Sequence, residues 1–399
     1  MALTLSVLTL NIWGIPIVSK DKDVRVRHIS EKLVQSDYDI ISLQEVWSEY
    51  DYVKIKERLK PVFPFSHYFY SGVVGSGLCV FSRYKIISSF FHHWPVNGYV
   101  HKIQHGDWFG GKGVGMCKIK VDDQVINFYL AHLHAEYDKK SDDYVTHRVI
   151  QAFDTAQFLE NTRGDCSMQI LAGDLNTEPG DLAYRILLST SKMKDSFVQK
   201  PSRFTGTHEY AYNTYTSGDI SDKNPDGIRI DYVLFRGNEN LDVEVDEYEL
   251  PMMDKIPELN ISYSDHEGIH VRFTIAEKTK NTSPHAIDNQ TIIESNIKNL
   301  KECINTCNKS LKMLESHRRS YTMMAIGLSV LLINIVEINP TYGFQTAYML
   351  LKFLLCGLTL FFIFMATLWN LQEKHGVLAG KLSMEMALSN LGDYLKASK

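Results

Sequence analysis

The sequence predicts an α/β domain followed by helices that anchor it in a membrane. Over residues 1–280, short runs rich in β-branched residues alternate with stretches of helical periodicity, which is typical of an α/β fold. After Ser283-Pro284, apolar residues recur at heptad spacing over 285–318, and two long apolar segments follow at 320–338 and 346–371. The chain has 399 residues, of which 44% are hydrophobic, so it can bury one large core and still supply this C-terminal region.

Eight strands are predicted in the first domain, because each run is apolar or alternates with period two between polar turns. They are Leu3–Ile12, Asp39–Leu43, Gly77–Ser82, Gly115–Val121, Val125–Ala131, Met168–Ala172, Ile230–Phe235 and Gly268–Phe273. Polar residues stand at or just past the ends of five of these regions: Asn11, Gln44-Glu45, His132, Asp174 and Asp231. Strand ends are where a sheet presents functional groups, so we expect one shared site.

Composition excludes some partners and compartments. The formal net charge is -5 at pH 7. Binding to a phosphate backbone needs clustered excess Lys and Arg, so we expect no nucleic-acid partner. The six cysteines form no C-x-x-C pair, which fits a reducing compartment. The first residues alternate with period two and lack a basic segment, which indicates a strand rather than a signal peptide. We therefore expect a cytosolic catalytic domain.

The C-terminal region predicts a membrane hairpin. Segments 320–338 and 346–371 are expected to be transmembrane helices, since a bilayer core needs about 20 apolar residues. Basic residues at 317–319, before the first span, and Lys374 and Lys381, after the second, put both outer ends in the cytosol. The catalytic domain and both termini would then be cytosolic.

The last segment, 373–399, is predicted to be a cytosolic helix that packs on the stalk, our name for 285–318. Its apolar residues follow heptad steps, which Lys381 interrupts. We expect antiparallel packing within one chain, as an extension of the membrane hairpin. The alternative is a homodimer through the stalk or the transmembrane helices. The sequence alone does not distinguish the two arrangements.

An ordered set of short motifs carries the predicted chemistry. In chain order they are L-N-I-W-G with Asn11, L-Q-E-V-W with Glu45, A-H-L-H-A-E-Y with His132, A-G-D-L-N with Asp174 and Asn176, R-I-D-Y-V-L with Asp231, and S-D-H-E with Asp265 and His266. Any one of these residues alone fits a turn, a cap or a core position. Their combination indicates a site.

The residue types in this set predict metal-assisted hydrolysis. One carboxylate together with amide and water oxygens suits Mg²⁺, so we expect Glu45 and Asn11 to be the metal ligands. A histidine held in one tautomer by a carboxylate can take a proton from water near neutral pH. His266 with Asp231 fits that role of general base.

Other residues are expected to support the charge that develops on phosphorus-bound oxygens. His132 and Asn176 can donate to those oxygens, while Asp174 would orient water or its neighbours. In the glycine-rich loop from Asp107 to Lys112, Lys112 is expected to reach the phosphate or a carboxylate, and Asp107 to set the loop conformation. The other interpretation of this loop is a flexible hairpin tip.

Taken in order, the motifs resemble the endonuclease/exonuclease/phosphatase superfamily, with G-D-x-N and S-D-H as the most specific pieces. The resemblance implies a deoxyribonuclease I-like fold, a four-layer α/β/β/α sandwich, and a catalytic place for Asp265 beside His266. Further stretches are V-W-S-E at Val46, G-S-G-L-C-V-F-S-R at Gly75, H-G-D-W-F-G-G-K at His105 and H-R-V-I-Q-A at His147. These are similar to the animal neutral sphingomyelinases whose catalytic domain precedes two transmembrane helices.

This resemblance implies Mg²⁺-dependent hydrolysis of sphingomyelin to ceramide and phosphocholine, with Mn²⁺ as a substitute ion. Water would attack in line, and the Glu45-bound ion would stabilise the phosphate and the leaving group. The implied location is the endoplasmic reticulum or nuclear envelope, with the plasma membrane as the alternative. Open alternatives for function are a phospholipase C for lyso-phosphocholine lipids, or a phosphoinositide phosphatase or nuclease on the same fold. We find no exposed aromatic hairpin like that of secreted bacterial relatives, so the tether is expected to replace it.

Overall fold

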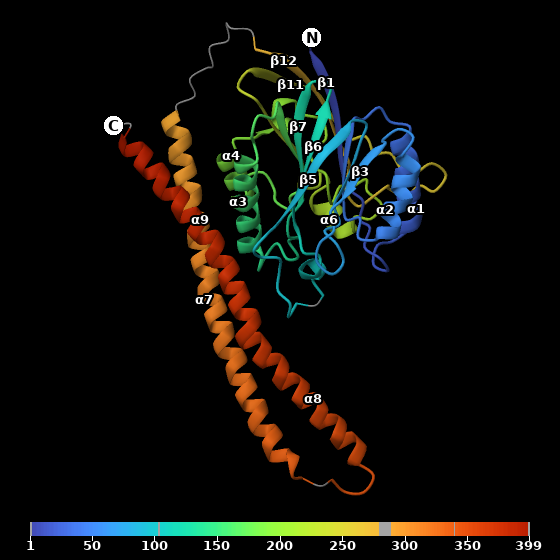
Figure 1. Cartoon of the computed structure of the whole chain (residues 1–399). Helices are drawn as coiled ribbons and strands as arrows, with labels where there is room; N and C mark the ends of the chain where they lie inside the picture. Colours follow the sequence, from blue (N-terminus) through green and yellow to red (C-terminus); the bar gives the residue numbers. More distant parts are fainter. Residues whose placement is uncertain (1, 103, 279–288, 339, 398–399) are drawn as a thin grey trace.

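Two six-stranded sheets form the centre of the computed structural model, which describes residues 2–102, 104–278, 289–338 and 340–397 (Figure 1). The first sheet has the order β11 (Leu241–Glu249), β12 (Ile269–Glu277), β1 (Leu3–Asn11), β2 (Ile40–Gln44), β4 (Cys79–Ser82) and β3 (Phe65–Tyr68). The second has the order β5 (Lys85–His93), β6 (Gly113–Val121), β7 (Gln124–His132), β8 (Met168–Asp174), β10 (Asp231–Gly237) and β9 (Lys194–Asp195).

The sheets are packed face to face and helices cover both outer faces. In β1, Leu5 and Val7 point between the sheets, while Leu8 and Leu10 point toward α1 (Lys22–Val34) and α2 (Glu49–Leu59). This strand is therefore buried on both faces, which explains its continuous apolar run. The outer face of the second sheet is covered by α3 (Val145–Asn161) and α4 (Leu182–Ser191). The predicted four-layer sandwich is confirmed.

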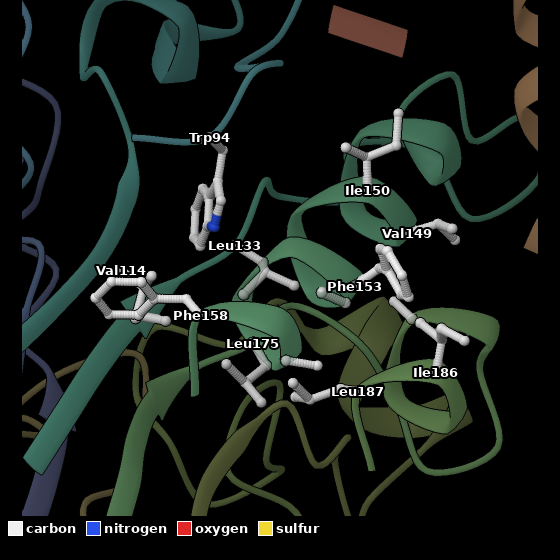
Figure 2. Packing of buried hydrophobic residues seen from close by; sticks show 14 of the residues in the cluster. Trp94, Val114, Leu133, Val149, Ile150, Phe153, Phe158, Leu175, Ile186 and Leu187 are labelled. Atoms are coloured by element: carbon white, nitrogen blue, oxygen red, sulfur yellow. The ribbon is translucent and has the colours of Figure 1, made fainter. Parts of the chain in front are cut away.

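Figure 2 shows the core between the second sheet and α3 and α4. Val114 from β6, Phe153 from α3 and Ile186 from α4 meet in this cluster. Leu133 and Leu175 belong to it as well, and each directly follows a predicted site residue at the end of its strand. Since buried leucines are costly to displace, this core fixes the position of the two strand ends.

All eight predicted strands occur, and β3, β5, β9 and β11 are additional. β11 has the sequence LDVEVDEYE, in which exposed acidic residues alternate with half-buried apolar ones. β5 has the sequence KIISSFFHH and is largely exposed. Acidic residues are depleted in strands on average, and exposed serines and histidines obscure the apolar alternation. Both strands lie at sheet edges, where tertiary pairing decides their conformation.

Three further helical segments form a long hairpin. They are α7 (Asn289–Val336), α8 (Gln345–Phe364) and α9 (Asn370–Ala397), with a π-helical turn at Met365–Trp369 between the last two. By length and composition, two helices are able to cross a membrane, Gln290–Val336 and Gln345–Lys396. The predicted boundary at Ser283-Pro284 lies outside the described residues.

The base of this hairpin lies against the α/β domain as well as against itself. Leu300, Cys303 and Leu314 of α7 share one buried cluster with Val377 and Met384 of α9 and with side chains of α3 and α4. Figure 1 shows α7 and α9 running beside α3 and α4 before the hairpin continues past the domain. The described part of the stalk, residues 289–318, is therefore a fifth layer on part of the sandwich.

Polar contacts join the same surfaces. Nη1 of Arg185 in α4 donates to Asn299 Oδ1 of α7 at 2.7 Å. Nε2 of His147 in α3 lies 3.3 Å from Glu373 Oε2 in α9, and both side chains are buried. A buried carboxylate without a partner is costly, so this contact favours one docked position of the hairpin.

Close approach of α9 to the domain depends on Gly376. A Cβ at this position would lie 2.4 Å from the Pro95 carbonyl oxygen, so we expect Gly376→Ala to destabilise the protein by about 1–3 kcal/mol through overpacking. Gly392→Ala on the same helix is the matched control, since nothing lies within 4 Å of its Cβ position. Thermal unfolding of the full chain in mild detergent should show a lower Tm for the first variant only. Equal Tm values would show that α9 does not dock here.

Candidate active site

Strand register brings the predicted residues to one edge of the two sheets. In the second sheet, His132 is paired with Asp174 across β7 and β8, and Asp174 with Asp231 across β8 and β10. In the first sheet, Asn11 is paired with Gln44, directly before Glu45. The shared edge predicted from the sequence therefore has a simple geometric origin in parallel and antiparallel pairing.

Asn11 links the two sheets. Its Nδ2 donates to Glu45 Oε1 at 3.1 Å and to Asp174 Oδ2 at 3.0 Å. Its Oδ1 accepts from the Trp13 backbone nitrogen at 2.9 Å. The Asn11 side chain is fully buried. One amide thus holds two carboxylates from different sheets in contact range of each other.

Glu45 has an unusual backbone conformation, with a φ of 59°. A non-glycine residue in this region is uncommon and is typical of functional sites, where surrounding contacts hold it in place. Trp47 provides such a contact, since its Nε1 donates to Glu45 Oε2 at 3.4 Å. Burial and the nearby Asp265 carboxylate raise the pKa of Glu45. A cation beside this group would favour its charged form.

Asp174 is the central carboxylate. Its Oδ2 lies 3.6 Å from His132 Nε2 and 3.8 Å from His266 Nε2, and its Oδ1 accepts from the Asn176 backbone nitrogen at 2.9 Å. Burial and the Asp231 carboxylate raise the pKa of Asp174. Crowded acidic groups of this kind need a compensating positive charge.

His266 and Asp231 form a buried pair. His266 Nδ1 lies 2.9 Å from Asp231 Oδ2, which leaves Nε2 on the side of Asp174. Burial lowers the pKa of His266, but the Asp231 carboxylate outweighs it, and the pKa lies well above its usual value. The His208 ring stacks on His266 with ring centroids 4.3 Å apart. Together these contacts fix the orientation of the imidazole.

Lys112 and Asp107 form a second buried pair under the site. Lys112 Nζ lies 2.6 Å from Asp107 Oδ1, donates to the Leu133 carbonyl at 3.0 Å, and lies 3.3 Å from His132 Nε2. Burial raises the pKa of Asp107, but the Lys112 ammonium outweighs it and holds this pKa well below its usual range. Lys112 therefore touches His132 and its own loop, and it does not line the cavity.

A cavity of about 520 Å³ opens over these residues, a volume suited to a small ligand. Seven of the predicted residues line it: Glu45, Asp107, His132, Asp174, Asn176, Asp265 and His266. Asn11 and Asp231 lie behind this surface and contact the lining carboxylate and histidine. One atom from each of Asp174, Asp231 and His266 lies within 4.8 Å of the others, a spacing that metal ligands can have. The oxygen-rich set of Glu45, Asn11 and Asp174 fits a hard divalent cation.

Sequence reasoning missed four residues that shape the site. Trp47 contacts Glu45, His208 stacks on His266, and Asp107 Oδ2 is approached by Tyr137 Oη at 3.3 Å and by His134 Nδ1 at 3.3 Å. His134 and Tyr137 belong to the motif A-H-L-H-A-E-Y, so their place in the site could have been predicted from that motif. His208 belongs to no such motif, and only the isolated bridge between His208 and His266 brings it to the site.

Substitutions in the Asp107–Lys112 pair are expected to change both stability and activity. Asp107→Asn or Lys112→Met alone leaves one buried charge unpaired, so each is expected to cost about 3–5 kcal/mol of unfolding free energy. The double variant removes both charges and should recover most of that stability. Its activity should stay low, because His132 loses the ammonium 3.3 Å from its Nε2. Denaturant unfolding and turnover of all three variants are the measurements, and strictly additive stability losses would contradict the pairing.

Comparison with known proteins agrees with this geometry. The chain matches the Endonuclease/Exonuclease/phosphatase family over residues 8–266. It is 42% identical to the putative neutral sphingomyelinase of Drosophila melanogaster, over 99% of each chain. It is 36% identical to sphingomyelin phosphodiesterase 2 of Homo sapiens, over 71% of this chain and 67% of the human one. The solved structure of SmcL superposes with a TM-score of 0.51 at 17% identity, over 68% of this chain and 99% of SmcL, which supports the fold.

The full-length similarity, the matched family and the two-sheet sandwich all agree with the resemblance seen in the motifs. The chain is a hydrolytic enzyme that belongs to the endonuclease/exonuclease/phosphatase family and, within it, to the neutral sphingomyelinases.

Proposed function

We propose that the chain hydrolyses sphingomyelin to ceramide and phosphocholine, in a reaction that depends on a divalent cation, Mg²⁺ or Mn²⁺ in its place. The relatives named above supply the substrate class, and the charge distribution of the cavity carries the proposal for this chain.

The cavity lining is acidic. Glu136, Glu178 and Glu209 belong to it, and within the described part of the chain Lys139 is the only Lys or Arg in the lining. That lysine is engaged, since its Nζ lies 2.9 Å from Glu209 Oε2. Carboxylates attract the quaternary ammonium of choline, and an acidic wall repels a headgroup that carries several phosphates. The acidic lining therefore favours phosphocholine over a phosphoinositide or a nucleic acid.

Aromatic side chains supply the second element of choline recognition. Trp13, Trp47, Phe109 and Tyr137 line the same cavity. Aromatic faces attract quaternary ammonium groups, with estimates of about 0.5–2 kcal/mol per contact. A lyso-phosphocholine lipid presents the same headgroup, so it remains the second candidate substrate.

Glu45 would hold the cation, with Asn11 and Asp174 as its oxygen neighbours. For Asn11 to bind through Oδ1, its amide would turn by half a rotation and give up the hydrogen bond from the Trp13 backbone nitrogen. When bound, the cation supplies positive charge that neutralises the phosphoryl oxygens and the leaving oxygen. It would also relieve the repulsion between Asp174 and Asp231.

Water is activated by His266. Its Nδ1 is held by Asp231, and a cation bound beside Asp174 would disfavour the imidazolium, so that Nε2 of the neutral ring could accept the proton as the water oxygen forms a bond to phosphorus. The bond between phosphorus and the ceramide oxygen breaks, that oxygen takes up a proton from solvent water, and His266 afterwards returns its proton to solvent. His132 lines the cavity, and among the described residues its Nδ1 has no hydrogen-bond partner. The imidazole of His132 and the side chain of Asn176 could each serve a phosphoryl oxygen.

The helical hairpin supports membrane attachment. Past the domain, its side chains are apolar and exposed, among them Ile326, Val330, Ile333, Phe353 and Leu360. Exposed apolar stripes on two long helices are typical of lipid contact. We infer that the hairpin spans the membrane with the catalytic domain and both outer ends in the cytosol, in the endoplasmic reticulum or nuclear envelope.

The test compares substrates on one preparation of the full chain in detergent. Phosphocholine release would be measured from sphingomyelin and from lysophosphatidylcholine, and phosphate release from a phosphatidylinositol phosphate, each with Mg²⁺ and with a chelator. We expect Mg²⁺-dependent release from sphingomyelin above the other two. A preference for the lyso-lipid would promote the second candidate, and a preference for the phosphoinositide would contradict the cavity argument.

A further inference from the structure

We propose that two short loops at the mouth of the cavity insert into the bilayer surface, so that the enzyme takes its lipid directly from the membrane. The loops are Ile15–Val18 and Val73–Val74, and together we name them the apolar rim. This inference rests on the proposed function for the identity of the substrate. The insertion of the loops into the bilayer does not depend on the proposed function.

The apolar rim is exposed to an unusual degree. Ile17 has a relative exposure of 104%, Val73 of 83% and Val18 of 67%. Single exposed apolar residues are ordinary, but aliphatic side chains on two loops around one opening form a patch that indicates a binding surface. Ile15, Pro16 and Val74 line the cavity itself, so the rim continues the cavity wall outward.

Hydrogen bonds hold Ile17 outward. The Ile15 nitrogen donates to Ser19 Oγ at 3.0 Å, and the Ser19 nitrogen donates to the Ile15 carbonyl at 3.1 Å. Ile17 at the tip of this turn has a φ of 70°. A β-branched residue rarely adopts this conformation, so the turn presents an isoleucine to the outside at a conformational cost.

The second loop is fixed to the Asp107–Lys112 loop. The Val73 nitrogen donates to the Phe109 carbonyl at 3.0 Å. Gly72 and Gly111 touch so closely that a Cβ on Gly72 would lie 2.7 Å from the Gly111 nitrogen. The rim is therefore connected to the loop that carries the buried Lys112 beneath the site.

The same loop reaches the membrane hairpin. Trp108, stacked on Phe109, has its ring centroid 6.4 Å from that of Trp369 in the π-helical turn. Trp369 lies near the end of the second apolar segment, before Glu373, and tryptophan is typical of the boundary between lipid and water. Trp108 and Phe109 thus join the rim to a residue at the level of the bilayer surface.

The arrangement in space agrees. In Figure 1 the teal loops that follow β5 lie at the end of the domain from which α8 and the second half of α7 extend. The rim loops themselves, I-P-I-V and V-V, carry no charge. A bilayer surface beside the hairpin is therefore the occupant that this position and composition favour. The tether was expected to bring the domain to its lipid by itself. The apolar rim adds a second point of contact with the membrane.

The first test separates bilayer from soluble substrate. Full chain carrying Ile17→Asp, Val73→Asp or both would be reconstituted in vesicles of phosphatidylcholine and sphingomyelin. Asp is strongly disfavoured in lipid, so we expect release from the vesicles to fall by about tenfold or more, while release from a water-soluble short-chain sphingomyelin stays unchanged. Ile87→Asp is the matched control, because Ile87 is exposed on β5 at the sheet end opposite the site. Unchanged release from vesicles in the double variant would overturn the proposal.

The second test reads insertion without activity. Ile17→Cys would be labelled with an environment-sensitive dye in a Cys356→Ser background, since the other five cysteines are buried. On vesicles we expect a blue-shifted emission that brominated phosphatidylcholine quenches, and no such change at Ile87→Cys. A blue shift without quenching would mean that a protein or a second copy covers the rim, which overturns the proposal. If the chain hydrolysed no sphingomyelin at all, quenching would still be observed, so the two failures are distinct.

Discussion

Glu45→Gln is expected to abolish divalent-metal binding and to lower turnover strongly. Glu45 is the carboxylate from the first sheet at this site, and Asn11 joins its Oε1 to Asp174 Oδ2. Glutamine keeps the size of the side chain and its contact with Asn11, but it loses the charge that a hard cation needs. Metal assistance is worth several kcal/mol, so activity should fall by about 10³-fold.

Calorimetric titration with Mg²⁺ and with Mn²⁺, alongside phosphocholine release, checks this result. Glu49→Gln is the control, because Glu49 pairs with Tyr70 Oη at 2.7 Å and lies outside the cavity lining. A Glu45→Gln enzyme that remained active and metal-dependent would show that another carboxylate holds the ion, with Asp174 as the first to examine.

His266→Asn is expected to lower turnover by about 10²–10⁴-fold while the protein stays folded, because general base catalysis typically contributes that much. Asparagine can still donate toward Asp231 from near the Nδ1 position, so the buried carboxylate keeps a partner. It lacks the nitrogen that would accept the proton of water.

The adjacent histidine provides the control for this variant. His208 stacks on His266, but its Nδ1 lies 3.2 Å from the Asp265 carbonyl, which is a structural contact. His208→Asn should therefore lose much less activity, and Asp231→Asn combined with His266→Asn should lose little more than His266→Asn alone. Comparable losses for His208→Asn and His266→Asn would reassign the base.

Strands and site residues could be predicted where the local apolar pattern agrees with the tertiary contacts. Buried strands such as β1 and β8 have continuous apolar runs, and the polar residue that ends each run marks the sheet edge. Pairing of His132 with Asp174 and of Asp174 with Asp231 then follows from register. The positions of these site residues along one sheet edge could therefore be predicted from the sequence, but the distances between their atoms could not.

Other features depended on contacts that no local pattern contains. The heptad residues of α7 predicted a partner helix, but the same residues also cover α3 and α4. Gly376 and Gly380 permit this approach, and neither is a heptad signal. α3 is buried on most sides, but the buried residues include polar ones such as His147 and Gln151, so no apolar pattern indicated the second covering layer. Likewise, Ile17 became informative only when its position at the cavity mouth was known.

Hydrolysis of sphingomyelin in ¹⁸O-labelled water, with Mg²⁺ or with a chelator, followed by mass spectrometry of both products, tests whether water attacks phosphorus in a cation-dependent reaction. A cation-dependent attack of water on phosphorus predicts one labelled oxygen in phosphocholine, none in ceramide, and no products when the cation is removed. Label in ceramide, or full activity in the chelator, would contradict it.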